Sequence, residues 1–180
     1  LDATLLTDIG DDAWGQMVRS HAEGSGVRVN GQRAGRTSSA TARIAEDGSA
    51  TYDFDVTWHL DANGHDLSKV AGMHVGSIGA FIEPGASEVR RLFASSGGLR
   101  TFDPNVRAAL MPTREQSLEI FNAIVNYADV VKMSDEDASW LFPELSPEEV
   151  VGMLVDRGVP LVALTLGARG ALLRSSVAAV

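Results

Sequence analysis

Hydrophobic and polar residues follow one another along the chain in segments that predict strands and helices in turn. Short apolar runs bounded by turn residues predict strands, and apolar positions spaced three or four apart behind a capping residue predict helices. We expect strands at residues 3–7, 36–45, 49–58, 73–76, 99–103, 130–132, 161–165 and 171–174. We expect helices that begin near Asp12, Ser87, Thr113, Ser134 and Ser146. This repetition favours an α/β fold, a mostly parallel sheet with helices on both faces.

We expect two of the predicted strands, 36–45 and 49–58, to pair with each other as a separate hairpin. Glu46-Asp47-Gly48 lies between them, and glycine accepts the positive φ that tight hairpin turns need. In the second strand Tyr52, Phe54, Val56 and Trp58 alternate with polar residues and therefore share one face. A strand with one apolar and one polar face belongs to a half-covered sheet. The hairpin is therefore predicted to be a small appendage to the parallel sheet.

Charge and composition narrow the classes of function. The 180 residues include 24 acidic and 15 basic side chains, a net charge of −9, which disfavours nonspecific nucleic-acid binding. The chain contains no cysteine, which excludes disulfides, thiolate catalysis and cysteine-based zinc sites. No apolar run approaches the roughly 20 residues of a membrane helix, and no secretory signal is visible. We expect a cytoplasmic protein without a nucleic-acid or membrane partner.

Polar clusters follow three of the predicted strands, where ligands of open α/β sheets bind. After the strand at 99–103, Asn105 has the groups to bond a hydroxyl and Arg107 those to hold an anion, although the residues alone favour a plain polar loop. After the strand at 130–132, Asp137 suits a hydrated Mg²⁺, although helix capping alone explains it. The third cluster, 165–171, has glycines that let a phosphate approach the backbone, although a hairpin has them too.

Sharper motifs of other enzyme classes are absent from the sequence. There is no Gly-x-Gly-x-x-Gly fingerprint for a dinucleotide and no Gly-x-x-x-x-Gly-Lys-Ser/Thr loop for a nucleoside triphosphate. Gly76-Ser77-Ile78-Gly79 is only half of a nucleophile elbow, because His74 stands where the first glycine belongs. The four histidines show no metal-ligand spacing.

Taken in order, the polar and glycine-rich blocks resemble the PfkB or ribokinase-like carbohydrate kinases over nearly the whole chain. Phe102-Asp103-Pro104-Asn105-Val106-Arg107 is similar to the Phe-Asp-Pro-Asn-x-Arg block of fructokinases and ketodeoxygluconate kinases. The other blocks are 9–15 with Gly26-Val27, 37–54 as the lid strands, 74–84, 131–137 and 165–171. The resemblance implies one partial ribokinase-like α/β domain over residues 1–180, with lid strands at about 36–58.

The resemblance implies transfer of the γ-phosphoryl group of Mg-ATP to a hydroxyl of a small sugar, with fructose favoured. It places Asn105, Arg107 and Phe54 at the sugar. It places ATP against Lys132, Thr165, Gly167 and Gly170. Asp137, through water, and Glu83 would serve Mg²⁺. The chain departs from the ribokinase pattern with Ser134 for Asn and Asp137 for Glu, which leaves the exact contact of the shorter carboxylate open.

Two parts of the family pattern are not found in the sequence. The segment that holds the sugar hydroxyls is expected before Leu1, and the Gly-Ala-Gly-Asp segment with the catalytic base is expected after Val180. The resemblance therefore places no catalytic residue in this chain, and we expect the 180 residues alone not to turn over.

Several alternatives stay open at this point. Within the family, the substrate could be ketodeoxygluconate, ribose or a nucleoside, because related polyols are told apart by a few hydrogen bonds. The other hypotheses are a non-catalytic sugar- or nucleotide-binding relative and a different α/β enzyme, such as a dehydrogenase. The aromatic face with Tyr52, Phe54 and Trp58 needs cover, which suggests a homodimer through the lid strands.

Overall fold

The computed structural model describes residues 2–32, 35–45, 50–60 and 65–176. The chain divides into two compact units, residues 1–63 and residues 64–180, which we call unit 1 and unit 2. The boundary falls where the sequence pattern changes to regular strand–helix repetition.

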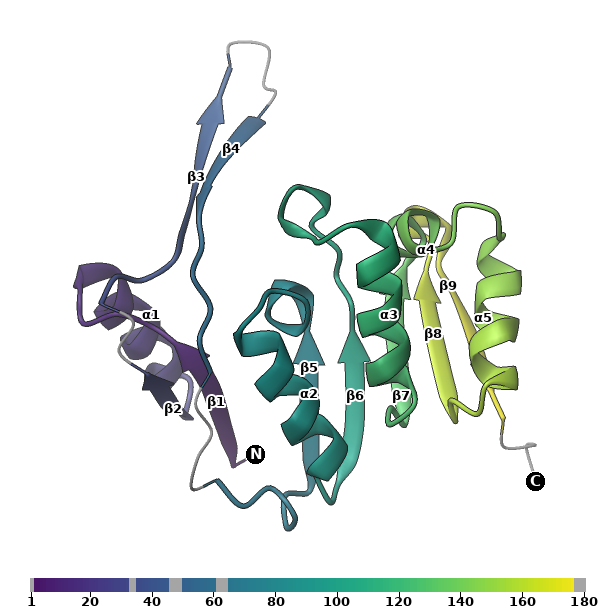
Figure 1. Cartoon of the computed structure of the whole chain (residues 1–180), viewed down its shortest axis with the longest axis horizontal. Coiled ribbons are helices and arrows are strands. Elements are labelled where there is room, and N and C mark those ends of the chain that lie inside the picture. The colour runs from purple at the N-terminus through teal and green to yellow at the C-terminus, as the bar shows by residue number, and fades with distance from the viewer. Residues whose placement is uncertain (1, 33–34, 46–49, 61–64, 177–180) are drawn as a thin grey trace. The chain divides into compact units, whose positions relative to one another are not determined.

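The described residues of unit 1 form two small sheets and one helix (Figure 1). Strands β1 (Ala3–Asp8) and β2 (Val27–Gln32) pair in parallel and are connected by α1 (Ala13–Gly24). Strands β3 (Ser39–Ile44) and β4 (Ala50–Asp55) pair antiparallel and form the predicted hairpin, which we call the lid hairpin. Its turn, predicted at residues 46–48, lies outside the described residues.

Sequence reasoning missed strand β2. The pair Gly26-Val27 was interpreted only as the end of the preceding helix. Gly26 does lie in the left-handed region with φ +78°, but the chain then continues directly into β2. Asn30 and Gly31 occur within this strand, and both residue types are depleted in strands, so its apolar pattern is weak.

Unit 2 is built on a five-stranded sheet in the order β5-β6-β7-β8-β9. Its strands are β5 (Gly72–Gly76), β6 (Leu99–Asp103), β7 (Val130–Ser134), β8 (Leu161–Thr165) and β9 (Ala171–Ser175). Its helices are α2 (Gly85–Ser95), α3 (Arg114–Val125), α4 (Asp135–Leu141) and α5 (Pro147–Asp156), and short 3₁₀ turns occupy Ser77–Ala80, Ala108–Leu110 and Gly167–Arg169. The first four strands are parallel and β9 is antiparallel to β8, which confirms the predicted mostly parallel α/β fold.

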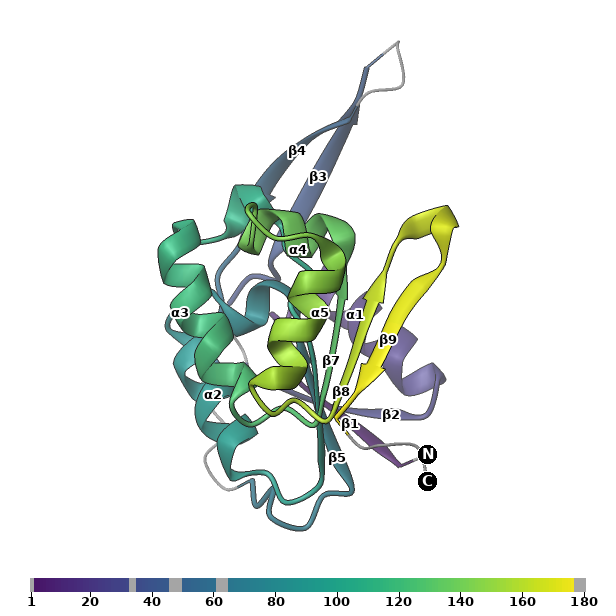
Figure 2. The same cartoon turned by 90° about the vertical axis from the view of Figure 1, so that its right-hand side faces the viewer.

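The core of unit 2 lies between this sheet and its helices. Figure 2 shows α2, α3, α4 and α5 along one face of the sheet, so the described helices of this unit cover one face and not both faces as predicted. Alternate residues of β7 and β8 point into the core, which gives the repeated pattern of one buried and one half-buried residue. The largest fully buried side chains include Phe81, Phe93, Phe102, Phe121, Leu92, Ile124, Met133, Leu141, Leu154 and Leu164.

Aromatic side chains form a continuous row through this core. The ring of Phe102 lies 6.3 Å from that of Phe81 and 5.6 Å from that of Phe121, and Phe121 in turn meets Phe142 edge-on at 5.6 Å. Such tilted and edge-on pairs are favoured by the ring quadrupoles and fix the spacing of strand β6 against α3 and the end of α4.

The starts of α3 and α5 confirm the predicted capping signals. The Thr113 hydroxyl accepts the Gln116 N–H while the Gln116 side chain accepts the Thr113 N–H, and the same reciprocal pair joins Ser146 and Glu149. Each box satisfies two backbone donors that a helix terminus leaves unpaired. The sequence therefore fixes where α3 and α5 begin.

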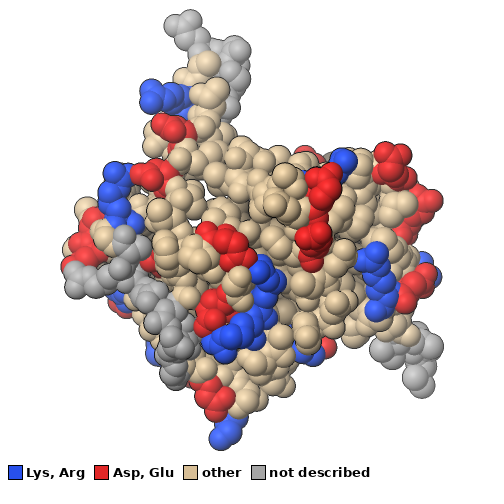
Figure 3. Space-filling view, viewed as in Figure 1, with Lys and Arg blue, Asp and Glu red and all other residues tan. Residues whose placement is uncertain are grey.

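None of the described helices is long and apolar enough to span a membrane. On the face drawn in Figure 3, Lys and Arg side chains lie among Asp and Glu side chains instead of gathering into one basic surface. This distribution agrees with the net charge of −9.

Candidate functional site

The carboxyl ends of the parallel strands in unit 2 bring the polar clusters together. Gly76 at the end of β5 is in register with Asp103 of β6, and Ser134 at the end of β7 is in register with Thr165 of β8. The Lys132 ammonium donates to Asp103 Oδ2 at 2.9 Å and so connects β7 to β6. The four strand ends therefore form one edge, as expected for a ligand site of an open α/β sheet.

The loop after β6 folds back on itself through Asn105 and Arg107. Asn105 has φ +39°, an uncommon left-handed conformation for a residue with a side chain, and its N–H donates to Asp103 Oδ1 at 3.2 Å. Arg107 Nη1 donates to Asn105 Oδ1 at 2.8 Å and to the carbonyl of Val106 at 2.9 Å. The Ser77 hydroxyl donates to the Asn105 carbonyl at 3.3 Å. These contacts hold the Asn105 side chain against the guanidinium, which is itself exposed.

Asp137 lies at the centre of the contacts between this loop and α4. Its side chain is buried, and Oδ1 accepts the Val106 N–H at 2.7 Å. Oδ2 accepts the Ser134 N–H at 2.8 Å, while the Asp137 N–H donates to the Ser134 hydroxyl at 3.0 Å. One carboxylate therefore caps α4 and fastens the loop after β6 to it.

The turn between β8 and β9 carries the predicted phosphate-binding glycines. Gly167 has φ +58° and Gly170 has φ +96°, and a Cβ on either would meet no atom within 4 Å. Glycine is therefore required there by backbone conformation and not by space. The Thr165 hydroxyl donates to the Met133 carbonyl at 3.5 Å, and Arg169 pairs with Asp135 of α4 at 2.9 Å.

Glu83 and Phe54 make their described contacts with other residues. Glu83, in the segment before α2, accepts the Ser87 N–H at 3.0 Å and pairs with Arg90 at 2.7 Å. Partial burial acts to raise the pKa of Glu83, but the hydrogen bonds from Arg90 and Ser87 outweigh it and lower the pKa. Phe54 belongs to β4 of unit 1, where its ring stacks on Tyr52 at 5.9 Å.

Residues 1–180 match the pfkB family of carbohydrate kinases. The chain belongs to that family. The expected resemblance is thereby confirmed.

Curated relatives of this pfkB chain include plant fructokinases. Fructokinase-1 of Oryza sativa subsp. japonica is 30% identical over 182 residues, which cover 93% of this chain and 56% of the relative. Fructokinase-1 of Zea mays is also 30% identical, with the same coverage. The chain spans about half the length of the curated relatives it matches.

Solved structures of similar fold include a fructokinase from Vibrio cholerae O395. Its apo form superposes with a TM-score of 0.79 and 27% identity, covering 97% of this chain and 64% of that one. The same enzyme bound to fructose, ADP and calcium superposes with a TM-score of 0.77 and 25% identity, covering 97% of this chain and 60% of that one. The ribokinase-like fold is therefore shown for this pfkB chain.

The carboxylates of this chain determine how it could hold the magnesium ion expected for a pfkB kinase. Among residues 2–32, 35–45, 50–60 and 65–176, no three His, Asp or Glu side chains gather as metal ligands. Both oxygens of Asp137 and both oxygens of Glu83 already accept hydrogen bonds. These carboxylates keep further lone pairs, which fits contact with a hydrated ion through water and not direct coordination.

Sequence reasoning missed three residues of the site region. Asp103 was named only within its motif, but its carboxylate holds both Lys132 and the Asn105 N–H. Ser77 has φ +55°, and its hydroxyl donates to the Asn105 carbonyl in the loop after β6. Its position directly after a strand was the signal that could have identified it. Nothing in the sequence indicates that Asp135 pairs with Arg169, because 34 residues separate the two.

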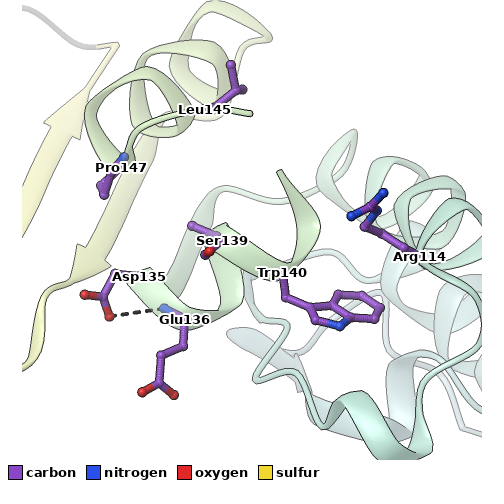
Figure 4. A pocket seen from close by; sticks show the side chains of 8 residues that line it. Arg114, Asp135, Glu136, Ser139, Trp140, Leu145 and Pro147 are labelled. Atoms are coloured by element: carbon purple, nitrogen blue, oxygen red, sulfur yellow. Dashed lines mark hydrogen bonds between the residues drawn. The ribbon is translucent and has the colours of Figure 1, made fainter. Parts of the chain in front are cut away.

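A broad hollow of about 800 Å³ lies over α4, beside the strand ends (Figure 4). Asp135 and Pro147 border it toward β8 and α5, while Trp140 and Arg114 lie together on the side of α3. None of the predicted site residues lines this hollow.

Proposed function

We propose that the full-length protein is an ATP-dependent sugar kinase that transfers the γ-phosphoryl group to a hydroxyl of fructose. The observation that carries this proposal is the 30% identity with rice fructokinase-1 over 93% of the chain, within the pfkB family. The fructose and ADP bound to the Vibrio cholerae fructokinase support the same two ligands for this chain.

At the sugar, we assign Asn105 and Arg107 to the junction between the accepting hydroxyl and the phosphate. Phosphoryl transfer depends on positioning and on neutralising charge, which suits an exposed guanidinium with five donors. Arg107 Nη1 is held by Asn105 and Val106, and no hydrogen bond is described for its other nitrogens. These are the donors we propose for phosphate oxygens. Phe54 of the lid hairpin would contact the sugar ring.

At the nucleotide, we assign Thr165, Gly167 and Gly170 to the phosphates and ribose of ATP. The two glycines leave the turn without side chains, so a ligand can approach its N–H groups closely. The Lys132 ammonium of β7 would add a positive charge, and its ion pair with the Asp103 carboxylate keeps it in place. Magnesium would neutralise phosphate charge when bound, with Asp137 contacting it through water and Glu83 in the same network. We assign no catalytic base, because the family resemblance matches none of the residues of this chain to one.

The first experiment measures ADP release by the full-length protein with Mg-ATP and fructose. Ribose, ketodeoxygluconate and adenosine are tested beside it, since the family resemblance leaves each of these substrate classes open. Release with fructose above the others supports the proposal. Release with another sugar would correct the substrate, and ATP binding without release would favour a binding relative. Absence of ATP binding would refute the proposal.

A glycine pair in unit 2 allows a matched test of the nucleotide turn. Gly170→Ala forces an alanine into φ +96°, and Gly158→Ala imposes the same strain at φ +98° after α5. Both should destabilise the protein by a similar amount, about 1 kcal/mol. Only Gly170→Ala should raise the KM for ATP, by about tenfold, because it adds a methyl group where phosphates approach. An equal KM change in both variants would contradict the assignment.

The lid hairpin is proposed to form a homodimer contact. Tyr52 is 59% exposed and stacks on Phe54, and Ile44 on the paired strand is 68% exposed. Apolar side chains so exposed on a two-stranded sheet favour burial against a second copy. Light scattering at micromolar concentration should give a dimer that Tyr52→Lys dissociates, and a wild-type monomer would contradict the proposal.

A cytoplasmic location stays a prediction from the sequence.

A further inference from the structure

The loop between β1 and α1 makes hydrogen bonds to both ends of the lid hairpin. The hairpin enters through residues 36–38 before β3 and leaves through residues 57–59 after β4. We call these segments the entry root and the exit root. Asp8 and Asp12 lie five and one residues before α1, and each contacts one root.

Asp12 anchors the entry root through three donors. Its Oδ2 accepts the Thr37 N–H at 3.0 Å, and its Oδ1 accepts the Thr37 hydroxyl at 2.6 Å and the Gly15 N–H at 2.8 Å. The hydrogen bonds from Thr37 and Gly15 lower the pKa of Asp12 to about 2. The carboxylate therefore caps α1 and binds the hairpin with the same two oxygens.

Two glycines allow Thr37 to lie this close to the loop. A Cβ on Gly10 would stand 2.7 Å from the Thr37 nitrogen, and a Cβ on Gly15 would stand 2.8 Å from the Thr37 hydroxyl and 2.0 Å from the Gly10 carbonyl. The Gly10 N–H donates to the Thr37 hydroxyl at 3.0 Å, so the hydroxyl is both donor and acceptor. The space for the root is therefore built into the sequence of the loop.

Asp8 anchors the exit root. Its side chain is 1% exposed, and Oδ2 accepts the His59 N–H at 2.8 Å across 51 residues of sequence. Its other oxygen is buried without a hydrogen-bond partner. The carboxylate is held by one backbone donor, and the His59 ring nitrogen Nδ1 lies 3.9 Å from the same oxygen. A buried carboxylate with so few partners is costly to keep, so this contact calls for an explanation beyond packing.

The two roots are also joined to each other. The Ser38 hydroxyl donates to the Thr57 carbonyl at 2.8 Å and accepts the Thr57 N–H at 3.0 Å. Arg36 pairs with Asp55 across the same place. A displacement of one root therefore carries the other with it.

We propose that Asp8 and Asp12 are positioning residues that fix the lid hairpin at both roots and thereby set the place of Phe54 for the sugar. Each acts through a backbone N–H of the hairpin and neither needs to touch a substrate. The anchoring stands on the contacts within unit 1. Its consequence for the sugar rests on the proposed function.

Substitutions can separate the anchors from the other roles of these residues. Asp12→Asn keeps an oxygen for the Gly15 N–H and an equally good helix cap, but presents an N–H₂ group to the Thr37 N–H. Asp8→Ala removes the acceptor of the His59 N–H, whereas Asp8→Asn keeps it and places its amide where the unpartnered oxygen stood. Asp156→Asn at the end of α5 changes charge equally, far along the chain.

The experiment measures backbone hydrogen exchange and steady-state kinetics on the full-length protein. Asp12→Asn should accelerate exchange at Thr37, and Asp8→Ala at His59, by about tenfold or more, the effect of losing a charge-assisted hydrogen bond. The same variants should lower kcat/KM for the sugar by about tenfold with the KM for ATP within about twofold, as for a displaced lid. Asp156→Asn should match wild type in both measurements, and Asp8→Asn, which keeps a neutral acceptor for the His59 N–H, should stay closer to wild type than Asp8→Ala.

The outcomes distinguish the anchoring from the assigned activity. Unchanged exchange at Thr37 and His59 in Asp12→Asn and Asp8→Ala would overturn the proposal. Faster exchange with unchanged sugar kinetics would overturn the positioning of Phe54. Equal losses toward sugar and ATP would show general damage to the fold and would also count against it. Faster exchange in a protein that turns over no sugar would support the anchoring and refute only the proposed function.

Discussion

The two units differ in how far their aromatic side chains are buried. In unit 2, Phe102 and Phe121 are at most 1% exposed and lie in a row of touching rings beneath α3. In unit 1, Trp14 on α1 is 63% exposed and Tyr52 on the lid hairpin is 59% exposed. Since burial of apolar area is the main source of folding free energy, unit 2 has a core of its own and unit 1 depends more on polar contacts.

Both units nevertheless use carboxylates in the same way at their strand ends. Asp137 joins α4 to the loop after β6 through the Val106 N–H, and Asp12 joins α1 to the lid hairpin through the Thr37 N–H. In unit 2 such a bond adds to a packed core, so its loss should appear as lost stability. In unit 1 it defines where the hairpin lies, so its loss should appear first as local motion.

The largest expected effect tests the contrast between the cores. Phe121→Ala should lower the free energy of unfolding by about 3–5 kcal/mol, because it leaves a cavity beside Phe102 and Phe142. Trp14→Ala should cost less than about 1 kcal/mol, since most of the indole is in solvent. Urea denaturation of the full-length protein measures both. Equal losses would mean that unit 1 buries Trp14 in the full-length protein and would break the comparison.

The next effect concerns Asp137. Asp137→Ala leaves the Val106 and Ser134 N–H groups without their acceptor and removes half of a capping box, so we expect a loss of about 2–3 kcal/mol. Glu136→Ala in the same turn is the matched control and should cost about 0.5 kcal/mol through the helix dipole. A loss for Asp137→Ala no larger than for Glu136→Ala would show that the loop after β6 does not depend on this carboxylate.

Much of unit 2 could be predicted from the sequence because its signals are local. Capping residues lie three positions apart, as in Thr113 and Gln116, and the apolar run of β8 ends at a glycine-rich turn. Short-range patterns of this kind depend on neighbouring residues and survive in any tertiary setting. The strand ends then follow, because parallel strands place their carboxyl ends on one edge.

The contacts that complete the site could not be predicted, because they join residues distant in sequence. Nothing near Asp8 indicates that its carboxylate is buried against His59, 51 residues later. Asp137 carries a visible capping signal, but its bond to the Val106 N–H depends on the register of β6 and β7. Strand β2 was missed for a related reason: it is defined by pairing with β1 more than by its own residues.

A smaller effect tests whether the capping boxes are local features. Ser146→Ala should lower the free energy of unfolding by about 1 kcal/mol, because the Glu149 N–H loses its acceptor at the start of α5. Glu149→Gln keeps a side-chain acceptor for the Ser146 N–H and should cost less. Thermal unfolding of both variants gives the difference. A loss confined to Glu149→Gln would reverse the assigned roles within the box.

The smallest expected effect is the pH dependence of the Asp12 anchor. Its pKa of about 2 in the folded protein is below the unfolded value of about 3.9, so the folded state favours the charged carboxylate. The contribution to stability is therefore complete above about pH 4, falls as the pH decreases toward 2, and vanishes below both values. The carboxyl carbon of Asp12, followed by NMR, should titrate near pH 2, whereas Asp12 in a Thr37→Val variant should titrate higher. An Asp12 midpoint near its ordinary value of 3.8 in the wild type would show that Thr37 does not hold this carboxylate, and the entry root of the lid hairpin would then lack its anchor.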